Sequence, residues 1–362
     1  MRATLVQAGL RGLSTAQVRQ VRAVRYGAAD EDVARVYREL ERDFGVLAPP
    51  IALHASSPDV LAAAWLVLRE TLLVPGTVPR AHKEAVSTAV SVGNNCPFCI
   101  SMHSSMLIDL VGYKDGAIPE PAARAAGEWA TANATVDGAA AHPVPFPVGQ
   151  APEMVGTAVV LQYLNRMVNI FLGELPLPPG APVASMTVVR RVLVWLIKSA
   201  ERAGPRPGAS FGLLPDAPLP ADLSWAQGHD AIAGAFARAA AVFDEAGRRC
   251  VPAEVRELVL EHLERWDGKP MGVSRAWVED AIAVLPAAQQ DAGRLALLTA
   301  LASYQIDQSV IDRFRAFRSD DRSLIDITSW ASMAAARRVG SWMKVPAEAT
   351  ESESLPPAPR SA

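Results

Sequence analysis

The sequence predicts an all-α fold, and two observations lead to that prediction. Residues 30–44 (DEDVARVYRELERDF) carry apolar side chains at intervals of three and four with charged side chains between them, and this spacing is typical of an amphipathic helix. The chain is also rich in alanine, valine and leucine, while only 6% of its residues are aromatic. Such a composition favours helices over strands.

Further helices are expected along the chain. Residues 57–73 repeat the helical spacing, with Ser57 at the N-cap position and Pro58 at the first helical position, where a proline is well tolerated. The same periodicity predicts helices over residues 79–92, 96–111 (closed by Gly112), 153–172 and 184–203.

Proline- and glycine-rich stretches separate these helices. Residues 139–152 form a predicted loop, and residues 175–182 a tight proline-rich turn. Residues 204–220 contain five prolines and three glycines, which makes them the best candidate for a boundary between two halves of the chain.

The two halves resemble one another. Residues 78–86 (VPRAHKEAV) align with residues 251–259 (VPAEVRELV), and the match extends to three further features. Residues 59–65 resemble residues 230–236, residues 153–171 resemble residues 291–314 in apolar rhythm, and Glu84 corresponds to Glu257. The same register places Lys269 and Gly272 where the first copy has two cysteines. The sequence therefore predicts two diverged copies of one helical unit.

This repeat defines the predicted domains. Residues 1–205 form a unit that carries a CxxC motif, and residues 206–345 form a degenerate second unit without the cysteines. Residues 346–362 are polar and proline-rich, and we expect them to form a disordered tail.

Length and charge narrow the class of protein. A chain of 362 residues suits two domains, and a net charge of −3 without a basic stripe argues against nucleic-acid binding. No apolar run reaches the length of a membrane span, and arginines interrupt the N-terminal segment, which argues against a secretory signal. With three cysteines, too few for a disulfide scaffold, we expect a soluble, cytoplasmic protein with reduced thiols.

The segment that carries chemistry is residues 84–103 (EAVSTAVSVGNNCPFCISMH), with the pattern E-x11-C-x2-C-x3-H. Gly93 and the two asparagines after it are expected to end one helix, and Pro97 suits the first turn of the next. Cys96 should therefore lie at a helix N-terminus, with Cys99 in the first turn. Free N–H groups and the helix dipole at such an end stabilise a thiolate, the nucleophile of peroxide reduction and disulfide exchange.

A histidine and a glutamate complete the pattern. At about 100° per residue, Cys96, Cys99 and His103 share one helix face, and the two sulfurs are close enough to form a disulfide. Glu84 lies on the preceding helix, which can pack antiparallel and bring the carboxylate to the same site. The predicted site is thus a nucleophile, a base and an orienting carboxylate.

Zinc binding and inert cysteines are the alternatives. Cys96, Cys99 and His103 could supply three ligands, with His82 or Glu84 as a fourth. The absence of a second CxxC pair and the helical setting favour a redox dithiol with no bound metal.

Other polar residues are expected to be structural. Cys250 stands alone before a helix start, and four histidines lack partner patterns: His54, His142, His229 and His262. Three polar residues interrupt an otherwise apolar helix, and we expect them to make contacts between helices or subunits: Asn165, Arg166 and Asn169.

The spacing of Glu84, Cys96, Cys99 and His103 resembles the carboxymuconolactone decarboxylase superfamily, and within it the AhpD-like alkylhydroperoxidases. The resemblance covers about residues 35–172, and the second half matches as a degenerate repeat. It implies an all-α AhpD-like fold with the site near a subunit interface. It also implies a homo-oligomer with fewer subunits than a single-unit member forms, because one chain supplies two units.

The resemblance also implies a mechanism. Cys99 would be the peroxidatic thiolate that attacks an organic hydroperoxide, Cys96 would resolve it to a Cys96–Cys99 disulfide, and Glu84 with His103 would relay protons. An external dithiol or a lipoyl-bearing protein would reduce the disulfide, with no haem, flavin or metal cofactor. The chain departs from some members at Phe98, where they carry a histidine.

Three other functions stay open at this point. A carboxymuconolactone decarboxylase-like enzyme would not need the two thiols. A thiol redox sensor would oxidise and bind a partner without turnover. A zinc-stabilised module would have a structural role only.

Overall fold

The computed structural model of the chain describes residues 2–112, 114, 117–173, 191–192, 194–200 and 204–345. These residues contain no β-strand, only two isolated bridges that join Val18 to Leu172 and Lys114 to Ala117. The predicted all-α class is therefore confirmed. Among the same residues, no helix is both long enough and apolar enough to cross a membrane.

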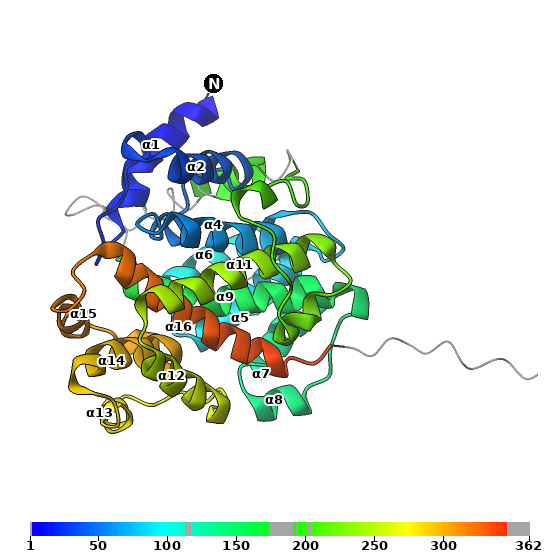
Figure 1. The fold of residues 1–362 in the computed structure, drawn as a ribbon. Coiled ribbons are helices and arrows are strands. Elements are labelled where there is room, and N and C mark those ends of the chain that lie inside the picture. Colours follow the sequence, from blue (N-terminus) through cyan, green and yellow to red (C-terminus); the bar gives the residue numbers. More distant parts are fainter. Residues whose placement is uncertain are drawn as a thin grey trace, which may run out of the picture.

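The first half of the chain forms a series of helices that follow one another closely (Figure 1). Their bounds are α1 Arg2–Ala16, α2 Glu31–Asp43, α3 Pro49–Ala52, α4 Pro58–Leu68, a π-helix Arg69–Leu73, α5 Arg80–Gly93, α6 Pro97–Val111, α7 Pro121–Ala132, α8 Val136–Ala141 and α9 Ala151–Phe171. Residues 194–200 are also helical.

The second half contains six further helices within its described residues. Their bounds are α11 Asp230–Cys250, α12 Ala253–Arg265, α13 Ala276–Ile282, α14 Ala287–Ala302, α15 Gln308–Arg315 and α16 Asp321–Trp342. The proline-rich residues 204–220 before α11 contain a 3-10 turn but no α-helix.

Helices of the two halves pack against one another. Helix α4 packs along α11, and α9 packs along α16. Pro79 and Pro252, which the repeat aligns, are the N-caps of α5 and α12 and have nearly the same backbone angles, φ −56° and ψ 141° against φ −53° and ψ 148°. The chain therefore contains two diverged copies of one helical unit, as the sequence predicted.

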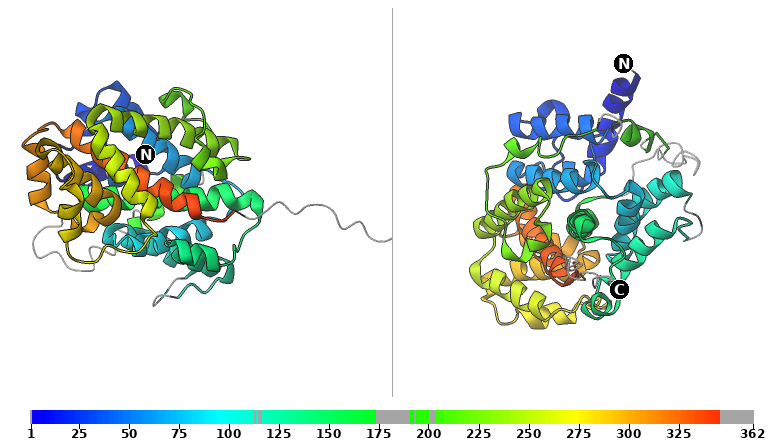
Figure 2. Two further views of the ribbon diagram at one scale, coloured as in Figure 1. Left: turned by 60° about the horizontal axis from the view of Figure 1, so that its bottom comes forward. Right: turned by 90° about the vertical axis from the view of Figure 1, so that its right-hand side faces the viewer.

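Helix α9 lies at the centre of the molecule and is seen end-on in the right-hand view of Figure 2. Every residue of this helix except Asn169 is buried. One hydrophobic core runs from residues of α2 to residues of α16 without a break. Because both halves share this core, the domain division at residues 205 and 206 stays a prediction.

The helix predicted over residues 57–73 is present, with two differences in detail. The helix expected over residues 57–73 changes at Arg69 to a π-helix, where the hydroxyl of Thr71 donates to Val67 O at 2.7 Å, an i−4 bond that often bends helices. Ser57 is the N-cap residue, but its side chain accepts no hydrogen bond from the helix, and its hydroxyl lies 2.6 Å from Asp326 Oδ1 and 2.9 Å from Asp59 Oδ1.

The third part of the predicted repeat also differs from the structure. Residues 291–314, matched by rhythm to α9, include most of α14, a 3-10 turn and most of α15. Three predicted segments lie wholly or partly outside the described residues: the turn 175–182, the helix 184–203 and the tail 346–362.

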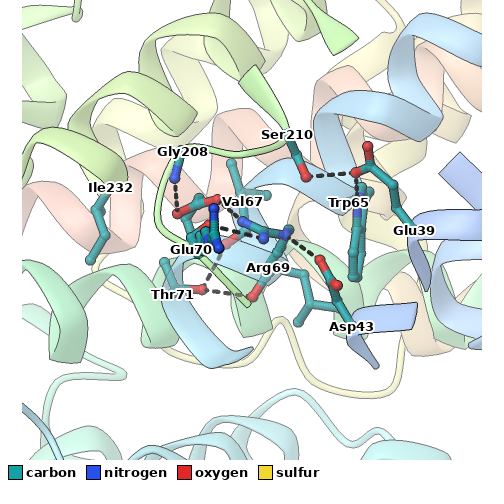
Figure 3. A network of polar contacts seen from close by, with 12 residues as sticks. Glu39, Asp43, Trp65, Val67, Arg69, Glu70, Thr71, Gly208, Ser210 and Ile232 are labelled. Atoms are coloured by element: carbon teal, nitrogen blue, oxygen red, sulfur yellow. Dashed lines mark hydrogen bonds and ion pairs between the residues drawn. The ribbon is translucent and has the colours of Figure 1, made fainter. Parts of the chain in front are cut away.

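A buried ion network connects α2, the π-helix and the segment that leads into the second half (Figure 3). Arg69, 1% exposed, donates to Asp43 at 2.7 Å, to Glu70 and to the carbonyl of Arg206 at 3.0 Å. Glu70 in turn accepts the backbone N–H of Gly208 at 3.1 Å. Burial raises the pKa of Glu70. The network thus joins the two halves through the buried side chains of Arg69 and Glu70.

A third carboxylate lies beside this network. Glu39 accepts hydrogen bonds from the indole of Trp65 and the hydroxyl of Ser210. The π-helix is therefore held from α2 on one side and from residues 206–210 on the other.

We expect Arg69→Met to lower the free energy of unfolding by about 3–5 kcal/mol, because it leaves the buried carboxylate of Glu70 without its cation and removes one of the two cations that pair with Asp43. The matched control is Arg265→Met, which breaks an ion pair whose side chains are 72% and 52% exposed and should cost less than about 1 kcal/mol. Urea unfolding followed by circular dichroism measures both. Equal losses in the two variants would contradict the stabilising role of the network.

Candidate active site

The turn between α5 and α6 has the predicted structure. Helix α5 ends at Gly93, Asn95 adopts the left-handed conformation with φ +50°, and Cys96 is the N-cap of α6 with Pro97 at its first position. Asparagine tolerates the left-handed region better than most residues. The N–H of Cys96 donates to Ser91 O at 3.0 Å. Both cysteines therefore lie at the start of α6, as the motif predicted.

Polar side chains of α9 hold this turn in place. Asn94 donates to Gln162 Oε1 at 2.9 Å, and Asn169 donates to the carbonyl of Asn94 at 3.1 Å. Ser91 donates to Asn165 Oδ1 at 3.3 Å. The expectation that Asn165 and Asn169 make contacts between helices is confirmed, and the structure adds Gln162, which the sequence analysis missed.

The remaining polar residue of this group, Arg166, also makes contacts between helices. Its guanidinium donates to Ala300 O of α14 at 2.9 Å and to Gln162 Oε1 at 2.7 Å. Burial lowers the pKa of Arg166 to about 10. It positions Gln162, which in turn binds the turn before Cys96.

Cys96 and Cys99 are adjacent and buried, 0% and 4% exposed, and both are free thiols. Burial, together with the neighbouring Cys96 thiol, raises the pKa of Cys99 well above its ordinary value. The sequence analysis expected the helix N-terminus to stabilise a thiolate here. The structure differs because the thiol is removed from water, and desolvation disfavours the charged form.

Glu84 and His103 form the predicted pair. The Nδ1 atom of His103 lies 2.7 Å from Glu84 Oε2, so α5 and α6 bring the carboxylate and the ring together across the turn. Glu84 is 0% exposed. Its other oxygen accepts from Arg80 Nε at 2.7 Å, and Arg80 also donates to the carbonyl of Leu72 at 3.0 Å.

These contacts define the charge state of the pair. Burial acts to raise the pKa of Glu84, but Arg80 and His103 outweigh it, and the pKa lies below its ordinary value. An ionised Glu84 only accepts hydrogen bonds, so His103 must donate from Nδ1. In the neutral ring the lone pair is then on Nε2. Nε2 is the nitrogen left to act as a base.

A cavity of about 820 Å³ opens beside these groups. Cys96, Cys99 and His103 all line it, together with the ring of Phe98. Its other walls come from α1, the segment 44–50, the end of α4 with the π-helix, and α9. Most of these side chains are apolar. The cavity is of a size typical of small-molecule sites, which span about 300–1,000 Å³.

The other sequence candidates lie away from the site. His82 Nε2 is 3.5 Å from Glu120 Oε2, and neither residue lines the cavity. Cys250 is buried, and burial raises its pKa. The four histidines expected to be structural do not line the cavity either: His54, His142, His229 and His262. In the described part of the chain, no group of three or more His, Cys, Asp or Glu side chains is arranged to hold a metal ion.

The second unit does not reproduce this site. Glu257, the counterpart of Glu84, is exposed. Lys269 and Gly272, which occupy the register of the cysteines, lie in the segment between α12 and α13. The pair of cysteines, the histidine and the glutamate meet in the first unit.

An all-helical repeat with a dithiol at a helix start, beside a Glu–His pair, defines a class of redox protein. The carboxymuconolactone decarboxylase family matches residues 58–118, which include all four of these residues. The chain belongs to the carboxymuconolactone decarboxylase family, within the superfamily that includes the AhpD-like alkylhydroperoxidases.

A particular relative covers both units. Alkyl hydroperoxide reductase Rv2159c of Mycobacterium tuberculosis is 38% identical over 333 residues, which span 90% of this chain and 94% of that protein. No solved structure matches the chain.

The raised pKa of Cys99 has a measurable consequence. Below its pKa, the thiolate fraction of a thiol falls tenfold for each pH unit. We expect alkylation of Cys99 by iodoacetamide in the native chain to rise about tenfold per unit up to about pH 9. Peptide mass spectrometry after timed quenching measures the rate, with urea-unfolded protein as the control. A plateau below about pH 8 in the native chain would contradict the raised pKa.

Proposed function

We propose that this protein is a thiol peroxidase that reduces organic hydroperoxides through a dithiol–disulfide cycle of Cys96 and Cys99. The observation that carries the proposal is the arrangement of the two thiols with His103 on the wall of one apolar cavity, and of His103 on the buried carboxylate of Glu84. The alkyl hydroperoxide reductase named above supports the same class of activity.

The first step is formation of the thiolate. Because burial raises the pKa of Cys99, its proton must pass to a base, and Nε2 of His103 is the nitrogen available to accept it. Glu84 stabilises the resulting imidazolium through Nδ1–H, and Arg80 keeps Glu84 ionised. A neighbouring base is a common way to activate a thiol.

The second step breaks the O–O bond. The Cys99 thiolate attacks the terminal oxygen of ROOH, so that an S–O bond forms, and the leaving alkoxide takes the proton from His103. The products are ROH and Cys99 sulfenic acid. The thiol of Cys96 then attacks the Cys99 sulfur and water leaves, which forms the Cys96–Cys99 disulfide and oxidises the pair by two electrons.

The third step restores the dithiol. A reductant with two thiols exchanges with the disulfide, returns both cysteines to thiols and itself becomes a disulfide. Cys96 and Cys99 are buried, so the reductant must enter through the cavity. This favours a slender dithiol, such as a lipoyl arm on a partner protein, over a globular thiol protein. The cycle draws its electrons from this dithiol, and we propose that it needs no haem, flavin or metal.

We also propose that the protein works in the cytoplasm and as a homo-oligomer. The cytoplasm keeps thiols reduced, and all three cysteines are free. Only three of the 15 residues of α6 are buried, and Ile108 on this helix is 55% exposed. An apolar helix with so much exposed surface is suited to contact with a second copy.

We expect one equivalent of cumene hydroperoxide to convert the reduced chain to a Cys96–Cys99 disulfide with the loss of two hydrogens. Cys99→Ser should abolish the reaction, whereas Cys96→Ser should stop at a sulfenic acid that dimedone traps. Cys250→Ser is the control and should behave as the wild type. Mass spectrometry of the intact chain and its peptides measures each product.

Other outcomes separate the alternatives. Full turnover by Cys99→Ser would overturn the proposal. A disulfide that forms once but is not recycled by any dithiol offered would favour a redox sensor.

The proton relay is tested by Glu84→Gln. The amide cannot compensate an imidazolium, so the rate of Cys99 oxidation should fall about 10²-fold, within the range of general acid–base effects. His82→Asn is the matched control, because His82 is on the same helix and its partner Glu120 does not line the cavity. Stopped-flow measurement of single-turnover oxidation reports both rates. An unchanged rate in Glu84→Gln would remove Glu84 from the mechanism.

A further inference from the structure

The cavity beside the cysteines has a polar corner. This corner forms where the segment after α1 meets the C-terminal end of α9. The N–H of Gly173 donates to Gln17 O at 2.9 Å, and the N–H of Arg19 donates to Phe171 O at 2.8 Å. Gln17, Arg19 and Asn169 line the cavity there, whereas most of the remaining wall is apolar.

Arg19 brings a fixed positive charge to this corner. Its guanidinium donates Nε–H to Ile170 O at 3.2 Å and Nη2–H to Asn169 O at 2.8 Å. These bonds hold the group in place and leave N–H groups on Nη1 and Nη2 for another acceptor. Arg19 is exposed, both of its side-chain hydrogen bonds among the described residues go to backbone carbonyls, and no aspartate or glutamate lines the cavity. The corner therefore attracts an anion.

Gln17 adds an independent sign of a missing ligand. Its side chain is 5% exposed, and Nε2 donates to Leu13 O at 3.1 Å. Oε1 is buried and accepts no hydrogen bond from the described residues. A buried acceptor without a donor costs free energy, so such atoms are rare unless a water or ligand satisfies them. An anionic head group has no donor of its own, but a water held between it and Oε1 would donate one hydrogen to each.

We propose that the cavity takes a long-chain monocarboxylic acid hydroperoxide, with its carboxylate on Arg19 and its alkyl chain along the apolar wall that leads to Cys99. This inference names the substrate class of the proposed peroxidase and rests on that function. The alternative for Arg19 is a purely structural role, because a cation at the C-terminal end of α9 also stabilises that helix. The two roles differ in what they predict for ligand charge.

Binding is tested first with an unreactive probe, so that the result does not depend on peroxidase activity. Isothermal titration calorimetry of the full chain should show oleate binding about tenfold tighter than oleyl alcohol, because a charge-assisted hydrogen bond is lost in the alcohol. Arg19→Gln should remove this preference, and Arg19→Lys should restore most of it. Arg22→Gln is the matched control, because Arg22 is exposed on the same segment and does not line this cavity.

Kinetics then connect binding to turnover. With the hydroperoxide of linoleic acid, Arg19→Gln should raise KM about tenfold and leave kcat nearly unchanged. The methyl ester of that hydroperoxide and cumene hydroperoxide should be used equally well by the wild type and the variant.

The outcomes distinguish this inference from the proposed function. If oleate binds no tighter than oleyl alcohol to the wild type, or if Arg19→Gln binds both as the wild type does, the inference is overturned. If no hydroperoxide oxidises Cys96 and Cys99 while oleate binding still depends on Arg19, the peroxidase proposal fails and the carboxylate site stands.

Discussion

The burial of α9 along almost its whole length is the constraint on which the site depends. A polar side chain on such a helix must find a hydrogen-bond partner inside the protein, because leaving it unpaired costs about 1–3 kcal/mol. Gln162 and the Oδ1 atom of Asn165 find theirs on the turn before Cys96 and on the end of α5, and Asn169, the one residue of α9 that is not buried, binds the same turn. The polar groups of α9 thus fix the position of the turn between α5 and α6. This turn then places both thiols at the start of α6.

Two opposing effects decide the state of the thiols. A helix N-terminus stabilises a nearby anion by about 0.3–1 kcal/mol, which is less than one pKa unit, or about 1.4 kcal/mol. Desolvation of a fully buried group can shift a pKa by several units. The effect of burial on the pKa of Cys99 therefore exceeds that of the helix N-terminus. The thiol stays protonated until a base removes the proton. Glu84 is buried as well, but Arg80 and His103 compensate its charge. The Glu84 carboxylate therefore stays ionised, whereas the nearby Cys99 thiol stays protonated.

The sequence predicts the parts of the site that depend on local chemistry. The Gly93–Asn95 break, Pro97 and the E-x11-C-x2-C-x3-H spacing are enough to place Cys96 at a helix N-terminus and to bring His103 to Glu84. The sequence analysis missed Arg80, although it lies four residues before Glu84 on the predicted helix, a spacing at which opposite charges pair. What the sequence could not show is the second contact of Arg80, with the carbonyl of Leu72 in the π-helix, because helical periodicity does not distinguish a π-helix from an α-helix. Nor could spacing show that α1 closes the cavity or that Cys99 is buried, because both depend on packing between segments far apart in the chain.

The second unit has lost the cysteines but still takes part in the site through α9. Helix α16 packs along one side of α9. Two groups near the end of α14 bind its polar residues, since Ala300 O accepts from Arg166 and the Ser303 hydroxyl accepts from Asn169. Arg166 and Asn169 are also the residues that hold Gln162 and the carbonyl of Asn94. A chain of hydrogen bonds therefore runs from the second unit through α9 to the turn before Cys96. The second unit therefore supports α9 and shares the core, although Glu257 is exposed and the segment at Lys269 is irregular.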